Sequence, residues 1–485
     1  RFDGSSFDLS SPIISKNIAR IIMQKDSTPW ELLDSAFESK QNSGTAAVNA
    51  STNEMAPLEG KAVLIVDSAL ATRRTLQDQV SQLGAKSVLF AATVSEVEQY
   101  LDTREFGLLI CEYQLEGDRN GQQLLEELRV QNKLPWFTVF MMVTGERTYS
   151  NVVSVAEFAP DEYLIKPFTA SSLSDRVVRT FNRKKKLARA YEAVFKGQYQ
   201  AVPGICMTLE KQHPQFAHEL ERMRIESIIR DGRLDEAVNE LEEAMAANAK
   251  PWMQLALSKI HTERKNFEAA EALLKKVVKE NPEYIMATDL YAEVLWEQNK
   301  PELALQTLEK LGAKALSSTS RLRKLADLSI RVGDDVRSKN YLNKVIDRSR
   351  NSSLTQMHDY LQFAKIFTKE GRHEEAEKLT SRLRTAVNSS ELNFARSLMT
   401  IQRISSEGDL AKARHRLEEL FKNEKELIEK LQADAQTSLL EQCFLVGMSK
   451  EGYEMARKIS KQKPGKALLD RIKFSIANQP KETTE

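Results

Sequence analysis

Cysteine is scarce in this chain of 485 residues, which has three copies at Cys111, Cys206 and Cys443. The three lie far apart and are odd in number, so the sequence excludes both a disulfide framework and a clustered zinc site. We therefore expect a reducing, cytoplasmic environment. The length of the chain predicts more than one domain.

Two further absences limit the partners. No apolar run approaches the ~20 residues that a membrane-spanning helix needs, and the polar start, residues 1–11, does not resemble a signal peptide. The chain also lacks an excess of charge of either sign, because 70 Lys and Arg stand against 69 Asp and Glu. We interpret the basic run from Arg183 to Lys186 as a solvated helix face rather than a nucleic-acid or membrane patch. We expect neither nucleic acid nor membrane as a partner.

Catalytic motifs are missing as well. The six histidines form no i, i+4 metal pair, and none falls between residues 60 and 182. The chain contains no glycine-rich phosphate loop and no Gly-x-Ser-x-Gly motif. We therefore do not expect an enzyme. The remaining candidates for a functional site are the polar residues at the ends of four apolar runs.

Each of these four runs ends in a polar residue. They are residues 62–66 before Asp67, 108–111 before Glu112, 140–143 before Thr144, and 163–165 before Lys166. A fifth run, residues 87–90, and helical patterns at 72–84, 94–101, 121–130 and 150–158 lie between them. Strands that alternate with helices predict a doubly wound, five-stranded parallel sheet with the polar residues at its carboxyl edge. Two carboxylates there suit Mg²⁺, whereas a hydroxyl and an ammonium suit phosphoryl oxygens.

This pattern resembles the CheY-like receiver domain of bacterial two-component response regulators, which has a flavodoxin-like α/β fold. The resemblance places Glu112 at the phosphoacceptor position, where the family has Asp. It implies that Thr144 is the switch hydroxyl, Lys166 the essential lysine and Tyr163 the aromatic residue that turns inward on phosphorylation. It also implies a cis-proline at Pro167. The metal ligands that it implies are Asp67, Glu112 and the backbone carbonyl of Gln114.

Two departures from the family pattern change what the site is expected to do. Glu is one methylene longer than Asp, about 1.5 Å along the chain, so its carboxylate reaches toward the space of a phosphoryl group. Glu112 then either imitates the phosphorylated state or marks a site that no longer accepts phosphate. Ser68 stands where the family has a second acid, and the lost charge predicts a weak Mg²⁺ site.

Small residues recur through the second half of the chain. They close short loops at positions 237, 270, 304, 338, 376, 413 and 456, at first roughly every 34 residues. Helices cross closely at such positions, so a larger side chain would clash. The pattern resembles the tetratricopeptide repeat, and the second unit shows it best, with Leu257, Ser258, Phe267, Ala270, Leu274, Val277 and Pro282.

An array of such repeats implies an all-α solenoid with an extended concave face that binds proteins. In the second unit, Trp252, Lys259 and Glu263 are candidates for that face. The alternative for Trp252 is packing against the preceding repeat. The alternative for the array as a whole is a dimer surface.

The sequence predicts an order of domains along the chain. A short helical segment at 1–40 and a flexible linker at 41–59 precede the receiver at 60–182, and connector helices at 183–215, repeats at 216–470 and a tail at 471–485 follow it. We predict a bacterial signalling adaptor that binds a histidine kinase, another response regulator or a downstream signalling protein. The alternatives are a phosphorylation-switched regulator in which Glu112 replaces the acceptor Asp, and a homodimeric scaffold.

Overall fold

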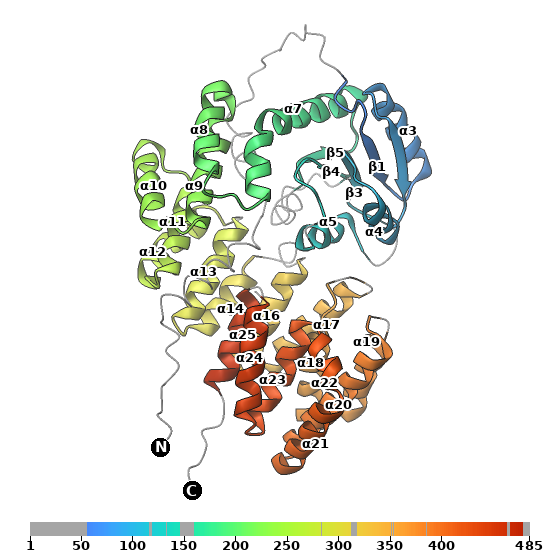
Figure 1. Ribbon diagram of the computed structural model, residues 1–485, viewed down its shortest axis with the longest axis vertical. Coiled ribbons are helices and arrows are strands. Elements are labelled where there is room, and N and C mark those ends of the chain that lie inside the picture. The colour runs from blue at the N-terminus through green and yellow to red at the C-terminus, as the bar shows by residue number, and fades with distance from the viewer. Residues whose placement is uncertain are drawn as a thin grey trace. The chain divides into compact units, whose positions relative to one another are not determined.

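The computed structural model describes residues 56–478 except 116–118, 132, 146–159, 283, 312–317, 351, 353, 385 and 463–465. Figure 1 shows its helices and strands. The chain divides into two compact units, residues 1–316 (unit 1) and residues 317–485 (unit 2). The helical segment predicted at 1–40, most of the linker predicted at 41–59, and the helix predicted at 150–158 lie outside the described residues.

Unit 1 contains a five-stranded parallel sheet. Its strands are β1 (Ala62–Val66), β2 (Ser87–Ala91), β3 (Leu108–Glu112), β4 (Val139–Thr144) and β5 (Glu162–Ile165). Their order in the sheet is β2-β1-β3-β4-β5, and every neighbouring pair is parallel. This is the flavodoxin-like strand order, so the predicted doubly wound fold is confirmed. The carboxyl ends of β1, β3, β4 and β5 therefore lie side by side.

Helices cover both faces of this sheet. They are α3 (Leu70–Gln82) and α7 (Ala170–Phe195) on one face, and α4 (Val94–Thr103) and α5 (Gly121–Val130) on the other. Successive side chains of a strand point to opposite faces. Val63 and Ile65 accordingly join the cluster beneath α3 and α7, whereas Leu64 and Val66 join the cluster beneath α4 and α5. Burial on both faces explains why the strands are continuous apolar runs.

Residues before the predicted boundary at residue 60 contribute to the core of unit 1. Leu58 is fully buried in the cluster beneath α3 and α7. Its backbone N–H donates to the carbonyl of Leu83 at 3.1 Å, just after α3. The prediction of a linker up to residue 59 is therefore wrong for its last residues. A single buried leucine in a polar stretch gives no periodic signal.

Helix α7 belongs to two cores at once. Its first half packs Leu173 and Val177 against the sheet, and its second half packs Leu187 and Ala190 against the helices that follow. The predicted boundary between residues 182 and 183 is wrong, because it falls inside this one helix. A receiver and a helical array that share an uninterrupted helix are joined without a flexible linker between them.

The basic run within α7 is only partly a solvated face. Lys185 and Lys186 are exposed as predicted. Lys184 is buried instead, and its ammonium pairs with Asp161 at 2.8 Å. The same ammonium donates to the carbonyls of Trp136 at 3.1 Å and Thr138 at 2.7 Å. Lys184, one of the four residues of the basic run, therefore anchors α7 to the sheet.

The other α-helices described in unit 1 each pack against the next helix along the chain. They are α8 (Val202–Gln212) with α9 (Ala217–Arg230), then α10 (Leu234–Asn248), α11 (Pro251–Glu263), α12 (Phe267–Glu280), α13 (Ile285–Glu297) and α14 (Pro301–Glu309). The small residues Ala237, Ala270 and Ala304 are fully buried where helices cross. This confirms the reason given for their recurrence, because nothing larger fits at those crossings.

Unit 2 continues the paired helices. Its elements are α16 (Thr319–Val332), α17 (Asp335–Ser349), α18 (Met357–Lys369), α19 (His373–Leu383), α20 (Ser389–Ser406), α21 (Leu410–Asn423), α22 (Lys425–Lys430), α23 (Ala433–Leu445), α24 (Ser449–Lys461) and α25 (Lys466–Ala477). Ser338 and Ala413 are fully buried at their crossings, as the repeat pattern requires. Paired helices thus extend through most of the chain after the sheet (Figure 1).

The inner face of unit 2 is closed by its own later helices. Helix α23 packs on α18 as well as on α20, and His358 of α18 bonds to Ser438 of α23. Helix α25 packs on α23, and its Arg471 pairs with Asp327 of α16. The tail predicted from residue 471 is wrong, because Arg471 and Ile472 are buried in a helix. The extended concave face that the repeats imply is therefore not open within unit 2.

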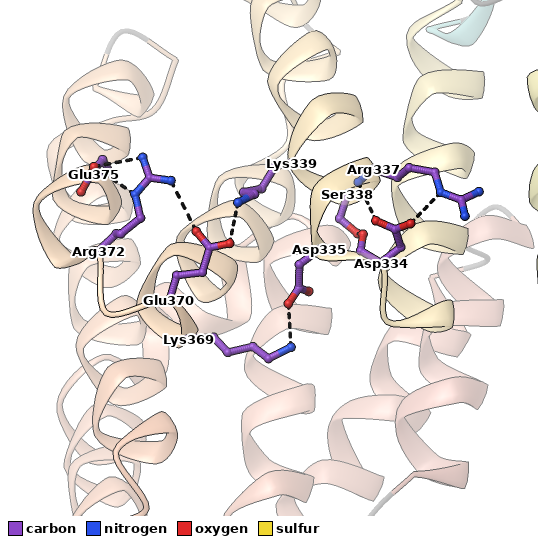
Figure 2. A network of polar contacts seen from close by, with 9 residues as sticks. All are labelled: Asp334, Asp335, Arg337, Ser338, Lys339, Lys369, Glu370, Arg372 and Glu375. Carbon is purple, nitrogen blue, oxygen red and sulfur yellow. Dashed lines mark hydrogen bonds and ion pairs between the residues drawn. The ribbon is translucent and has the colours of Figure 1, made fainter.

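Ion pairs join consecutive helix pairs along the loops of unit 2, as Figure 2 shows. Lys369 pairs with Asp335 at 2.7 Å, and Lys339 pairs with Glu370. Pairs of the same kind recur between other neighbouring repeats, as in Lys300 with Glu271 and Lys458 with Glu429. These side chains are partly or largely exposed, so we expect the pairs to fix the register of the repeats more than to stabilise them.

Replacing one of these cations is expected to have a small effect. The Lys369→Met variant should lose less than about 1 kcal/mol of unfolding free energy, because exposed pairs are screened by water and salt. Urea denaturation at low salt and at 1 M NaCl measures the loss, which should shrink at the higher salt concentration. A loss that is large and independent of salt would mean that the contact between repeats depends on this pair.

Candidate functional site

The four polar residues predicted at the carboxyl edge of the sheet end up next to one another. Asp67 follows β1 directly, Glu112 is the last residue of β3, Thr144 is the last residue of β4, and Lys166 follows β5. Because β1, β3, β4 and β5 are consecutive neighbours in the sheet, their ends form one continuous edge. The strand register sets Glu112 beside Val143 and Thr144 beside Ile165.

Lys166 links the two carboxylates at this edge. Its Nζ lies 3.3 Å from Oδ2 of Asp67 and pairs with Oε2 of Glu112. The remaining oxygens accept backbone hydrogen bonds, Oδ1 of Asp67 from Ala69 at 2.7 Å and Oε1 of Glu112 from Tyr113 at 3.1 Å. Each carboxylate is therefore held on both sides. The longer side chain of Glu112 brings its carboxylate to the Lys166 ammonium.

Electrostatics favour the charged form of this lysine. Burial works against the charge, but the hydrogen bond and charge of Glu112, together with the charge of Asp67, outweigh it and raise the pKa of Lys166 above its usual 10.5. The Lys166 side chain remains 33% exposed, so water screens part of the attraction. The trio carries two negative charges and one positive charge when all three groups are ionised.

A raised lysine pKa makes the stability of this edge depend on pH at the alkaline end. The contribution of Lys166 is complete below pH 10.5, its usual pKa, and it is lost as the pH rises through the higher pKa of the folded state. We expect Lys166→Arg to remove this loss, because the guanidinium stays charged. Unfolding free energies of both proteins from pH 8 to pH 12 check it. Parallel pH curves for the two would contradict the assignment.

The other residues implied by the resemblance lie as follows. Thr144 and Tyr163 are buried, Gln114 is exposed, and the bond between Lys166 and Pro167 is cis, which confirms the predicted cis-proline. Tyr163 lies in the cluster beneath α4 and α5. Burial, then the neighbouring Tyr113, raises the pKa of Tyr163 well above its usual value. Its role as the aromatic switch residue stays a prediction.

Two neighbours of Glu112 have roles that the sequence did not reveal. A Cβ on Gly121 would lie 2.4 Å from the carbonyl oxygen of Glu112, so only glycine lets α5 begin against this strand end. The thiol of Cys111 is buried and donates to that same carbonyl at 3.3 Å. Burial, then Glu112 and Asp67, raises the pKa of Cys111 well above its usual value. It is therefore a packing residue and not a nucleophile.

A Mg²⁺ ion fits this edge poorly. Both carboxylates that were predicted to bind it, Asp67 and Glu112, already pair with the Lys166 ammonium. Ser68 adds no charge, and only the carbonyl of Gln114 is left as a predicted ligand. The described part of the chain holds no group of three or more acidic, His or Cys side chains suited to a metal. The donor set is that of a weak metal site at most.

The three residues of α11 that were predicted to bind a partner differ in their burial. Trp252 is buried in a cluster with Ile225 and Ile228 of the preceding repeat, and the guanidinium of Arg222 lies 5.6 Å from its ring centroid. The packing alternative therefore describes Trp252. Lys259 and Glu263 are partly exposed, so they stay candidates for a binding face in unit 1.

Comparison with known proteins agrees with this geometry. Residues 63–178 match the response regulator receiver domain family, and residues 229–287 and 262–328 match the tetratricopeptide repeat family. The chemotaxis protein CheY of Pseudomonas aeruginosa is 27% identical over 121 residues, which are 25% of this chain and 96% of that protein. CheY-3 of Vibrio cholerae is 26% identical over 121 residues, 25% of this chain and 92% of that protein.

Solved structures were found for both kinds of domain. A signal receiver domain of a putative LuxO repressor from Vibrio parahaemolyticus has a TM-score of 0.24 and 21% identity, and covers 26% of this chain and 92% of its own. A tetratricopeptide repeat protein from Parabacteroides merdae has a TM-score of 0.36 and 14% identity, and covers 53% of this chain and 98% of its own.

Among the described residues, no helix combines the length and apolar character needed to cross a membrane. The chain carries a CheY-like receiver domain of the response regulator family, followed by tetratricopeptide repeats.

Proposed function

We propose that this protein is a signalling adaptor of a bacterial two-component system, with a receiver that works without accepting phosphate. The single observation that carries the proposal is the contact of the Glu112 carboxylate with the Lys166 ammonium. In a phosphorylatable receiver that ammonium is available to the oxygens of the phosphoryl group. Here a permanent carboxylate takes that role, and the buried ring of Tyr163 agrees with an engaged state.

The adaptor acts by occupying surfaces of other proteins. A receiver and tetratricopeptide repeats are both domains that bind signalling proteins, and the sequence has neither a glycine-rich phosphate loop nor a Gly-x-Ser-x-Gly motif. We therefore propose a cytoplasmic protein without enzymatic output, whose partner is a histidine kinase, another response regulator or a downstream signalling protein. The shared helix α7 supports the joint use of both domains, because Asp161 and Glu162 at the start of β5 are both paired with cations of this helix.

Binding measurements with a captured partner test the adaptor. The immobilised full chain recovers a partner from extract of the source cells, and titration then gives its dissociation constant. We expect the constant to be unchanged by acetyl phosphate, and to rise about tenfold, or ~1.4 kcal/mol, in Glu112→Gln, which loses the charge at the acceptor position. The matched control is Glu105→Gln, an exposed acid before β3 at the opposite edge of the sheet.

Two outcomes would count against the adaptor. If acetyl phosphate tightens binding by the unaltered chain, the receiver is a phosphorylation switch. If Glu112→Gln binds as well as the Glu105→Gln control, then the engaged acceptor position is irrelevant to partner binding, and the receiver serves only as a scaffold.

A further inference from the structure

The inner helices of unit 2 leave a cavity of about 160 Å³ where they converge. Helices α16, α18, α23 and α25 all contribute to its wall, among others through Arg331, His358, Gln362, Glu441, Arg471 and Phe474. It is the space that remains after α23 and α25 have closed the inner face. None of these residues belongs to the receiver, so the cavity is independent of the site described above.

Arg471, which lines this cavity, has an unused hydrogen-bond donor. The residue is only 5% exposed, and its Nε donates to Oδ2 of Asp327 at 2.9 Å. Its Nη2 is buried too, and among the described residues it has no hydrogen-bond partner. Leaving a buried charged donor unsatisfied is costly, so such a group calls for an acceptor that enters from outside. A ligand with an oxyanion provides one.

The surrounding charge also favours an anion. Burial, followed by the cations Arg471, Arg323, Lys365 and Arg331, lowers the pKa of His358 well below its usual value. His358 is therefore a neutral ring, and its Nδ1 lies 2.6 Å from Oγ of Ser438. Lys365 is exposed and lines the cavity, where it meets an incoming anion first.

The acids around the cavity are already committed to neighbours. Asp327 accepts from Arg471, and Glu441 accepts from Nε2 of Gln362 at 2.6 Å. Asp359 is held by Arg323, and Asp434 accepts from the backbone N–H of His358 at 3.3 Å. Burial raises the pKa of Glu441.

The apolar part of the wall limits the kind of anion. Ile330, Phe444, Leu445 and Phe474 line the cavity beside the charged groups, and such surface favours a hydrocarbon body over an inorganic ion. The cavity of about 160 Å³ has room for a small organic acid. We propose that this cavity binds a small organic carboxylate, with one carboxylate on Arg471 and its carbon chain against the two phenylalanines.

Calorimetric titration of succinate and glutarate into the full chain tests this site. We expect saturable binding of one molecule per chain. Lys365→Gln should weaken it about fivefold through the loss of an exposed charge, and Arg471→Lys more than about tenfold through the loss of the Nη2 donor. Lys369→Gln is the matched control, because it removes the same charge from the same helix at a residue that pairs with Asp335 outside the cavity.

Several results would overturn the proposal. One is the absence of saturable binding of either acid up to about 10 mM, far weaker than a specific site. Another is equal affinity for inorganic phosphate, which would leave charge as the only requirement. Binding of an acidic peptide without binding of the free acids would make this a protein-docking site instead. Where Arg471→Lys fails to fold by circular dichroism, the exposed Lys365→Gln decides, and affinity equal to that of Lys369→Gln contradicts the site.

Discussion

Acetyl phosphate is expected to phosphorylate this receiver only after its acceptor has been shortened. The unaltered chain and the Ser68→Asp variant should take up no phosphoryl group, because Glu112 at the acceptor position is paired with Lys166 and held by Tyr113. Glu112→Asp withdraws the carboxylate by about 1.5 Å and should accept phosphate slowly. Glu112→Asp combined with Ser68→Asp should accept it fastest, because the second acid restores charge for the divalent cation.

Intact-mass spectrometry after incubation with acetyl phosphate and Mg²⁺ measures the uptake of one phosphoryl group per chain. Lys166→Met in the doubly substituted protein is the control, and it should slow the uptake because the ammonium no longer neutralises the transferred group. Stoichiometric phosphorylation of the unaltered chain would end the proposal of a phosphate-independent receiver. Failure of both Asp variants would mean that more than the acceptor has been lost from the site.

The sheet and its edge could be predicted because their sequence signals are local. The strands β1, β3 and β4 are buried on both faces and so appear as unbroken apolar runs, and the polar residue at the end of each marks the carboxyl edge. Parallel pairing then brings those ends together without further information. The length of the Glu112 side chain predicted only that its carboxylate reaches toward the space of a phosphoryl group; its pairing with Lys166 is known from the structure alone. The recurring small residues likewise predicted close crossings, because any larger residue is excluded there.

The errors share a different origin, which is contact between residues far apart in the sequence. Lys184 and Arg471 lie in polar, charged stretches that are typical of solvated helix faces, yet both are buried. Their burial is decided by Asp161 and Asp327, the second of which lies in a helix at the other end of unit 2. Side-chain periodicity reports which face of a helix is apolar, but it does not report which charge will find a partner.

Closure of the inner face in unit 2 has the same cause. A repeat pattern specifies how each helix pair packs on the next pair, and this predicted an open concave surface. Whether later helices of the chain pack on the inner face of earlier ones is decided by contacts such as the bond between His358 and Ser438, which are 80 residues apart. The prediction of a tail from residue 471 was wrong for this reason. A short amphipathic segment at the end of the sequence resembles a tail as long as the helix on which it packs is not known.

Replacing Lys184 is expected to destabilise the receiver more than any other substitution of the basic run. Lys184→Met leaves the Asp161 carboxylate buried, with the Arg129 guanidinium at 4.0 Å as its remaining cation. Losing one partner of a buried pair costs about 3 kcal/mol of unfolding free energy. Lys185→Met is the matched control and should cost little, because Lys185 is exposed. Guanidinium chloride denaturation of the full chain gives both values.

The pH dependence of that loss identifies its source. Burial disfavours the Asp161 charge, but Lys184 and Arg129 outweigh burial and lower the pKa of Asp161 below its usual 3.8. A lowered acid pKa stabilises the fold above pH 3.8, and this stability is lost as the pH falls through the folded value. The cost of Lys184→Met should therefore be full at pH 7 and shrink toward pH 3. Asp161→Asn combined with Lys184→Met should recover most of the loss at pH 7. If the double variant is no more stable than Lys184→Met, then the bonds from Lys184 to the carbonyls of Trp136 and Thr138, and not its pairing with Asp161, anchor α7 to the sheet.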